Sequence, residues 1–290
     1  MTIQRGVLKM NFLDQENIQV DKIIEQALIE DIGTGDITTE SIIPYDLKAK
    51  GIIKAKEEGI IAGLGIAELV FKKLNPEITF QAKIKDGIKV SPGEILAEIT
   101  GPAQTILKGE RIALNFIQKM SGIATTTYQF CQEVKDFPVH ITDTRKTTPG
   151  LRILEKYAVR IGGGYNHRFG LYDAVLIKDN HLAIAGGVKA AISSIRKRIS
   201  HTMKIEVEVE NLFQLQEALE LQVEIIMLDN MDLDTIRKAV KIAKNKVLIE
   251  VSGGITLEKV KEIAQTGVDL ISVGALTHSV KSLDINMEII

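Results

Sequence analysis

The sequence predicts an α/β protein in which a separate α+β domain, over residues 1–110, precedes a parallel α/β barrel over residues 111–275. Two observations support this division. Before residue 110, hydrophobic residues alternate along one segment with the period of a half-buried antiparallel strand. After residue 135, short β-branched runs alternate with helical stretches of about 10 to 15 residues, the pattern of repeated βα units.

The first domain begins with helical spacing and then changes period. The predicted elements are a helix over residues 18–30, a helix over residues 66–74 and a strand over residues 77–84. In the strand, Ile78, Phe80, Ala82 and Ile84 share one face. A turn follows at Asp86-Gly87.

Residues 103–135 have helical periodicity with a predicted break at Ser121-Gly122. Six strands are expected after them. They cover residues 139–142, 174–178, 204–209, 223–228, 246–251 and 269–273. Their regular alternation with helices predicts a parallel barrel, and residues 276–290 form a tail that we expect to return to the first domain.

Polar or glycine-rich residues follow every predicted barrel strand. In α/β barrels ligands bind at the carboxyl ends of the strands, so these residues should line one site. They are Asp143-Thr144-Arg145-Lys146, Lys178-Asp179-Asn180, Glu208, Asp229-Asn230, Ser252-Gly253-Gly254 and Gly274-Ala275. The two glycine-bearing ends offer main-chain amides for a phosphate, although Ser252-Gly253-Gly254 is also compatible with a tight turn.

Cations are dense between Asp143 and His181. One group of them, Arg152, Lys156 and Arg160, recurs at four-residue spacing and is interpreted as a solvated helix face. The other group lies at element ends, where side chains can point into a cleft; it comprises Arg145, Lys146, His167, Arg168 and Lys178. Because like charges repel at short range, this second group indicates a polyanionic ligand.

Several residues have structural interpretations. Gly162-Gly163-Gly164 follows a helix, so a flexible helix stop is expected and a dinucleotide-binding motif is excluded. Glu206 and Glu208 share one side of their strand, which leaves open which of them faces a site and which faces solvent. Cys131 is expected in the core. The remaining histidines with no evident partner, His140, His201 and His278, are expected to be structural, and no spacing suggests zinc.

Composition narrows the class of protein. The chain has 290 residues, of which 45% are hydrophobic and 26% charged, and its net charge of −2 gives no indication of nucleic-acid binding. Its single cysteine excludes an internal disulfide and fits a reducing cytosol. No apolar run approaches the ~18 residues of a membrane span. A cytoplasmic protein without nucleic-acid or membrane partners is expected.

Seven motifs resemble one enzyme family in order and spacing. They are DTRKTTPG, EKYAVR, GGGYNHR, LIKDNH, EVEVEN, LDN and VSGGI, with GTGDIT and ERIALNFIQKMSGIAT before them. Together they resemble quinolinate phosphoribosyltransferase, a pentosyltransferase of NAD synthesis. The resemblance implies an N-terminal α/β sandwich domain, an incomplete (open) barrel and a homodimer. It also implies two polyanionic substrates, quinolinate and phosphoribosyl pyrophosphate, and products nicotinate mononucleotide, pyrophosphate and CO2.

The resemblance assigns roles by motif. The residues implied for quinolinate are Thr144, Arg145, His167, Arg168 and Lys178, with Arg111 reaching into the partner's site. The residues implied for phosphoribosyl pyrophosphate are Lys146, Glu208, Asp229, Ser252, Gly253, Gly254, Gly274 and Ala275. Among these, Lys146, Glu208 and Asp229 are the implied catalytic residues, and the two carboxylates hold Mg²⁺ indirectly, through the substrate that carries it.

Three alternatives belong to other classes. Lys178 at a strand end is compatible with the Schiff-base lysine of a barrel aldolase. A molybdenum-associated relative of the same family and a non-catalytic barrel that binds a phosphate ligand would keep the fold. The full set of charged strand-end residues argues against both of these.

Overall fold

The computed structural model describes residues 18–243 and 245–290, which form two compact units. The first unit runs to Gly122 and also contains Ile153–Ala158 and Ser282–Ile290. The second contains Ile123–Arg152 and Val159–Lys281. The domain limits derived from the sequence stay a prediction.

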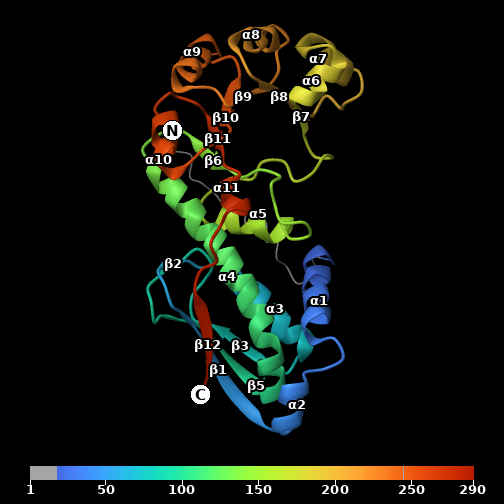
Figure 1. Cartoon of the computed structure of the whole chain (residues 1–290), viewed down its shortest axis with the longest axis vertical. Coiled ribbons are helices and arrows are strands. Elements are labelled where there is room, and N and C mark those ends of the chain that lie inside the picture. The colour runs from blue at the N-terminus through green and yellow to red at the C-terminus, as the bar shows by residue number, and fades with distance from the viewer. Residues whose placement is uncertain (1–17, 244) are drawn as a thin grey trace. The chain divides into compact units, whose positions relative to one another are not determined.

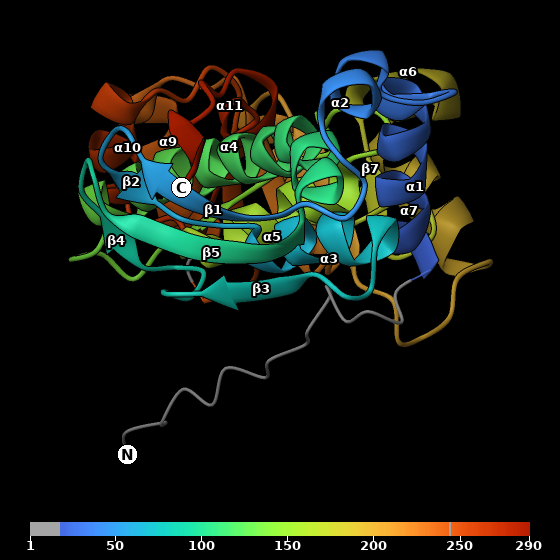
Figure 2. The ribbon, with the colours of Figure 1, turned by 90° about the horizontal axis from the view of Figure 1, so that it is seen from below.

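An antiparallel sheet organises the first unit. Its strands lie in the order β12 (Ile285–Ile289), β1 (Lys48–Ala55), β5 (Ile95–Pro102) and β3 (Thr79–Ala82). Figure 2 shows β1, β5 and β3 side by side. The other elements of the unit are helices α1 (Ile18–Ile32), α2 (Ile37–Ile42) and α3 (Leu64–Leu74), and a small sheet of β2 (Gly59–Ile60) with β4 (Lys89–Val90).

Six parallel strands organise the second unit, in the order β6-β11-β10-β9-β8-β7. Their bounds are β6 His140–Thr142, β7 Val175–Ile177, β8 Ile205–Val209, β9 Ile225–Asp229, β10 Leu248–Ser252 and β11 Leu270–Ser272. Because β6 and β7 are the two edges and do not pair, the barrel is open. The predicted fold class is confirmed, and all six strands lie within two residues of their predicted limits.

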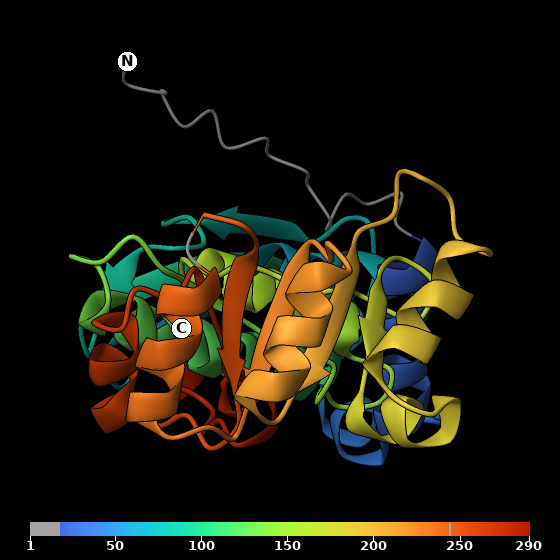
Figure 3. The same cartoon turned by 90° about the horizontal axis from the view of Figure 1, so that it is seen from above.

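Helices follow the barrel strands: α5 (Arg152–Ile161), α6 (Asp179–Ala185), α7 (Val188–Arg196), α8 (Leu212–Glu220), α9 (Leu233–Ala243), α10 (Leu257–Ala264) and α11 (Ala275–His278). Most of α5 belongs to the first unit, whereas α8 and α9 lie on the outer face of the parallel sheet, as Figure 1 and Figure 3 show. The buried side chains of β8 to β10 include Val207, Ile226 and Ile249, which provide the core between sheet and helices. Among the described residues, no helix is long and apolar enough to cross a membrane.

Two predictions for local structure were wrong. The break at Ser121-Gly122 does not occur, because α4 runs without interruption from Ala103 to Glu133. The Ser121 hydroxyl is buried and exchanges hydrogen bonds with the main chain of Ala62, so a polar side chain is accommodated inside the helix. The strand over residues 77–84 shortens to β3, an edge strand on which Ala82 is exposed.

The helix α5 also departs from prediction. Lys156 is fully buried, and Arg152 donates hydrogen bonds to Thr147 Oγ1 (2.9 Å) and to the main-chain oxygen of Phe169 (2.9 Å). Only Arg160 is exposed, with its guanidinium 5.1 Å from the centre of the Tyr165 ring. The three cations therefore do not form one solvated face. Helical spacing predicts which residues share a face of the helix, but it does not predict whether other parts of the protein bury that face.

The three glycines after α5 allow close packing rather than flexibility. A Cβ atom at Gly162 would lie 2.4 Å from the main-chain oxygen of Ala124 in α4, and one at Gly164 would lie 2.8 Å from Thr127. Gly163 has φ +93°, the left-handed conformation that ends a helix. Nearby Cys131 is partly buried, and burial raises the pKa of its thiol to about 11, which fits an unreactive packing residue.

The close approach at Gly162 predicts a loss of stability on Gly162→Ala. The added methyl group meets main-chain atoms that cannot rotate away, so we expect the free energy of unfolding to fall by about 2 kcal/mol. Gly65→Ala is the matched control: Gly65 is exposed in α3 with open space around it, and the change should stabilise by about 0.5–1 kcal/mol. Urea denaturation measures both. Equal effects would contradict the packing argument.

Candidate active site

A cavity of about 720 Å³ lies at the carboxyl ends of the parallel strands. Every residue that the family resemblance assigned to a substrate, except Arg111, lines it, whereas the predicted strand-end residues Asp143 and Asn180 do not. The assigned residues that line it are Thr144, Arg145, Lys146, His167, Arg168, Lys178, Glu208, Asp229, Ser252, Gly253, Gly254, Gly274 and Ala275. Arg111 belongs to the first unit, where it is exposed on α4. The parallel strands thus bring together residues that are more than 100 positions apart in the chain.

Asp143, the first residue after β6, is an anchor and not a ligand-facing group. It is fully buried and accepts hydrogen bonds from the main-chain N–H of His167 (2.9 Å) and the side-chain amide of Asn166 (2.6 Å). These bonds connect the end of β6 to the segment between α5 and β7. That segment carries both His167 and Arg168, so Asp143 helps to place them at the cavity.

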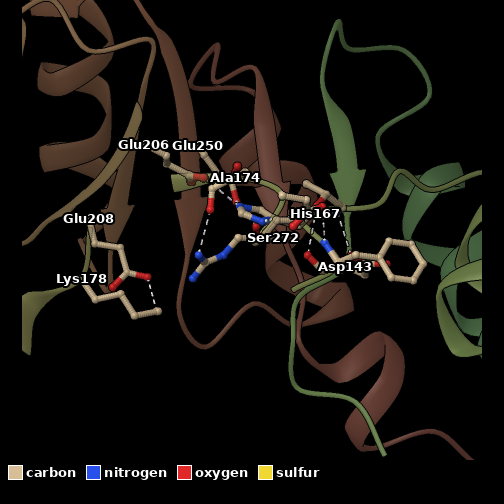
Figure 4. Close-up of polar contacts among 12 residues, drawn as sticks. Asp143, His167, Ala174, Lys178, Glu206, Glu208, Glu250 and Ser272 are labelled. Carbon is tan, nitrogen blue, oxygen red and sulfur yellow. Dashed lines mark hydrogen bonds and ion pairs between the residues drawn. The ribbon is translucent and has the colours of Figure 1, made fainter. Parts of the chain in front are cut away.

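Both ring nitrogens of His167 are engaged inside the protein (Figure 4). The main-chain N–H of Arg168 donates to Nδ1 (2.8 Å), so Nδ1 is an acceptor and the ring proton resides on Nε2. Nε2 lies 3.0 Å from Glu206 Oε2 and 3.6 Å from Glu250 Oε1. Glu250 in turn accepts a hydrogen bond from the Ser272 hydroxyl. His167 therefore links its own segment to β8, β10 and β11.

Glu206 and Glu208 both face the interior of the barrel. Glu206 is 4% exposed and Glu208 is 8% exposed, so the expectation that one of them faces solvent was wrong. All residues of β8 are buried because helices cover one face of the sheet and the site residues cover the other. Burial, together with the charge of Glu206, raises the pKa of Glu250 to about 7.

Lys178 pairs with Glu208 across the end of the sheet (Figure 4). Burial raises the pKa of Glu208, and its hydrogen bond and ion pair with Lys178 act in the opposite direction. The amino group of Lys178 is thus engaged by a carboxylate, whereas a Schiff-base mechanism needs that group to attack a carbonyl carbon. The structure therefore gives no support to an aldolase site at Lys178.

Two arginines at the cavity have buried donors that lack an acceptor. The Nε atoms of Arg145 and Arg168 are buried and have no hydrogen-bond partner among the described residues. Burial and the neighbouring Arg145 lower the pKa of Arg168. One other donor of Arg168, Nη1, is held by the main-chain oxygen of Ala174 at 3.1 Å. Unsatisfied buried donors are costly, which favours an anionic ligand with several acceptor atoms.

The glycine-bearing strand ends leave main-chain atoms accessible. Gly253 and Gly254 have φ values of +100° and +60°, and a Cβ atom at Gly253 would lie 2.1 Å from Asn230 Oδ1. Asn230 itself adopts φ +52° and donates its main-chain N–H to the Ser252 oxygen (3.0 Å). These conformations allow a ligand to approach the main chain of the loop closely, as in phosphate-binding loops.

Three residues at or beneath the cavity were not predicted as site residues: Glu250, Ser272 and His278. Glu250 lies two positions before Ser252, and Ser272 two positions before Gly274, so the period of a strand places each on the side of a predicted site residue. His278, expected to be only structural, lines the cavity one helical turn after Gly274. His140 stacks on Tyr165, with ring centres 4.2 Å apart.

Family models match nearly all of the chain. The model for the C-terminal domain of quinolinate phosphoribosyl transferase matches residues 123–288, and the model for its N-terminal domain matches residues 36–121. The chain belongs to the quinolinate phosphoribosyltransferase family. Its activity is that of this family, nicotinate-nucleotide pyrophosphorylase (carboxylating), in NAD biosynthesis.

Individual relatives are similar to this chain over nearly its full length. A "Probable nicotinate-nucleotide pyrophosphorylase [carboxylating]" of Bacillus subtilis is 48% identical and covers 94% of each chain. A mitochondrial "Quinolinate phosphoribosyltransferase [decarboxylating] 2a" of Nicotiana tabacum is 39% identical and covers 100% of this chain and 92% of its own. The structure of nicotinate-nucleotide pyrophosphorylase from Francisella tularensis superposes with a TM-score of 0.91 at 40% identity, covering 96% of this chain and 99% of its own.

The raised pKa of Glu250 predicts a pH dependence of stability. The pKa of Glu250 lies above the 4.5 of an ordinary glutamate, so the folded state favours the protonated carboxyl group. The contribution of this group to the free energy of unfolding is therefore full below pH 4.5 and is lost as the pH rises through about 7. Wild-type protein should lose on the order of 3 kcal/mol more than Glu250→Gln between pH 5 and pH 8. Chemical denaturation at several pH values measures this difference, and parallel profiles for the two proteins would contradict it.

Proposed function

We propose that this cavity is where the family reaction takes place: the phosphoribosyl group passes to the ring nitrogen of quinolinate, and the 2-carboxylate leaves as CO2. One observation carries this assignment. Buried, unpaired guanidinium donors of Arg145 and Arg168 share a cavity with the glycine loop at Gly253-Gly254. A dicarboxylate and a phosphate ester are the two ligands that these two surfaces suit.

The two substrates are assigned to two adjoining groups of residues around the cavity. On the quinolinate side we place Thr144, Arg145, His167, Arg168 and Lys178. On the phosphoribosyl pyrophosphate side we place Lys146, Glu208, Asp229, Ser252, Gly253, Gly254, Gly274 and Ala275. Guanidinium groups suit the carboxylates because they bind them in a bidentate manner, whereas main-chain amides suit the 5-phosphate.

Mg²⁺ is proposed as the cofactor that accompanies the pyrophosphate. Glu208 and Asp229 both line the cavity and offer the hard oxygen atoms that Mg²⁺ prefers, so the residues fit this ion. Bound there with its substrate, the ion would neutralise charge on the leaving pyrophosphate. Lys146, which also lines the cavity, would contribute a further positive charge to the phosphates.

Catalysis in this proposal depends on orientation and electrostatics. Two polyanions that repel each other are held side by side by fixed cations. As pyrophosphate departs, the carboxylates of Glu208 and Asp229 stabilise the positive charge that develops on the ribose. Alkylation then leaves the pyridine nitrogen positively charged, which stabilises the carbanion formed when the adjacent carboxylate is lost as CO2. The carbanion takes up a proton from water to give nicotinate mononucleotide.

A homodimer is proposed to complete the site. Arg111 is exposed on α4 and does not line the cavity of its own chain. We propose that Arg111 of one protomer reaches the quinolinate side of its partner's cavity. The proposed setting is the cytoplasm, with no nucleic-acid or membrane partner, which agrees with the near-neutral net charge and single cysteine.

The decisive assay offers the purified enzyme quinolinate, phosphoribosyl pyrophosphate and Mg²⁺, with nicotinate as a parallel substrate. Chromatography should detect nicotinate mononucleotide from quinolinate and not from nicotinate, because nicotinate provides only one of the two carboxylates that the arginines hold. Equal product from both substrates would contradict the two-carboxylate assignment. No product from either would favour a non-catalytic phosphate-binding role or a molybdenum-associated relative.

Substitution of residues assigned to quinolinate should affect the binding of the two substrates differently. Arg145→Ala or Lys178→Ala is expected to weaken quinolinate binding at least about 10-fold and to change phosphoribosyl pyrophosphate binding by less than about 3-fold, since each removes one charge-assisted contact. Isothermal titration calorimetry with each substrate measures this. Equal losses of both affinities would refute the division of the cavity.

Subunit mixing tests the proposed sharing of the site. Arg111→Ala and Lys178→Ala homodimers should each be inactive, and exchange between them should restore intact sites in mixed dimers. Activity is measured after exchange has been verified by mass spectrometry, with each variant incubated alone as the control. Verified mixed dimers without recovered activity would place Arg111 outside the shared site.

A further inference from the structure

The segment that carries Arg168 has no helix or strand of its own. Between Tyr165 and Val175 the chain is irregular, yet this segment brings a guanidinium group to the quinolinate side of the cavity. Side-chain contacts must therefore hold it in place. Asp143 holds one end through His167, and Asp173 accepts the main-chain N–H groups of Phe169 and Gly170.

His167 is the central contact of this segment. Its Nδ1 accepts the main-chain N–H of Arg168, and its Nε2 donates to Glu206. The ring thus joins the backbone at Arg168 to a carboxylate of β8 through both of its nitrogens. Although His167 lines the cavity, its hydrogen bonds make it a link between the loop and the sheet.

The far end of this link is deeply buried. The side chains of Glu206 and Glu250 are 5% and 2% exposed, and both approach His167 Nε2. Ser272 donates to Glu250, so the link reaches β8, β10 and β11 at once (Figure 4). A pair of buried carboxylates contributes little to fold stability, since apolar replacements of buried charges are often neutral or stabilising. Their placement calls for a different explanation.

We propose that Glu206 and Glu250 are positioning residues, which hold His167 and, through it, the main chain at Arg168 so that the Arg168 guanidinium faces quinolinate. This inference rests on the proposed function of the cavity and extends it to residues that do not touch the substrate. Glu206 acts by accepting the Nε2 hydrogen bond, and Glu250 lies 3.6 Å from the same ring nitrogen. Their contribution concerns quinolinate, because the segment that His167 holds carries Arg168 and none of the residues placed with phosphoribosyl pyrophosphate.

The test compares Glu206→Leu, which has similar volume and no acceptor, with Glu206→Gln, which keeps an acceptor oxygen. Calorimetry should show the Kd of quinolinate raised about 10-fold or more in the leucine variant and within about 3-fold of wild type in the glutamine variant. The Kd of phosphoribosyl pyrophosphate should change less than about 3-fold in both. Glu224→Gln is the matched control, because Glu224 accepts the Ile205 N–H at the opposite end of β8.

A double-mutant cycle with His167→Leu tests the route of the effect. If Glu206 acts through His167, Glu206→Leu adds nothing to the quinolinate Kd of the His167→Leu protein, whereas independent effects multiply. His167→Leu alone should reproduce the loss of quinolinate affinity, which keeps the test decisive should Glu206→Leu fail to fold. Glutamine and leucine variants that lose affinity equally, or losses that multiply in the cycle, would overturn the proposal.

Two further outcomes are informative. The ligand-capable atoms of His167, Glu206 and Glu250 lie within 4.8 Å of one another, so metal analysis of the purified protein belongs in the experiment. Stoichiometric metal in the wild type that is lost in Glu206→Leu would replace the positioning role by a metal site. Absence of quinolinate binding in the wild type would overturn the function of the cavity as well, which distinguishes that failure from one seen only in the variants.

Discussion

Charge balance at the carboxyl ends of the parallel strands is the constraint on which the site depends. Arg145, Arg168 and Lys178 converge on one cavity, and two unit charges about 4 Å apart interact by roughly 4 kcal/mol at an effective dielectric near 20. Inward-facing carboxylates on β8 offset this repulsion: Glu208 pairs with Lys178, and Glu206 interacts electrostatically with Arg168 and binds His167. The barrel interior therefore holds its cations in place before any substrate arrives, but no residue that the structure describes accepts a hydrogen bond from Nε of Arg145 or Arg168.

The fold supplies the geometry that this balance requires. Parallel strands end on one side of the sheet, so single residues placed after β6 to β11 meet in one cavity without any long-range sequence signal. Helices on the outer face keep water from that side of the strands. Short turns between strand and helix give each site residue a defined direction, whereas the irregular segment around Arg168 needs Asp143 and His167 to hold it.

The sequence was sufficient for the parallel sheet and most of the site, because strand periodicity and strand ends are local patterns. It was insufficient where burial depends on partners far along the chain. The four-residue spacing of Lys156 predicted which face of α5 the side chain lies on, but not that other residues bury that face. Gly162 was interpreted as a flexible helix stop because its close contact with α4 cannot be inferred from the local sequence. Glu206 illustrates the same limit. The alternation of residues along β8 predicts which face of the sheet its side chain lies on, but not that His167 is its neighbour there.

The pairing of β12 with β1 has a consequence for how the chain is made. Gly51 in β1 pairs with Ile289, more than 200 residues later, while the whole parallel sheet lies between them in sequence. At about 5–20 residues per second, a ribosome would need tens of seconds to supply the missing strand. Until then β1 is an open edge with unpaired main-chain groups, the kind of surface on which nascent chains associate. The nascent chain would therefore depend most on a chaperone between the synthesis of β1 and the synthesis of β12.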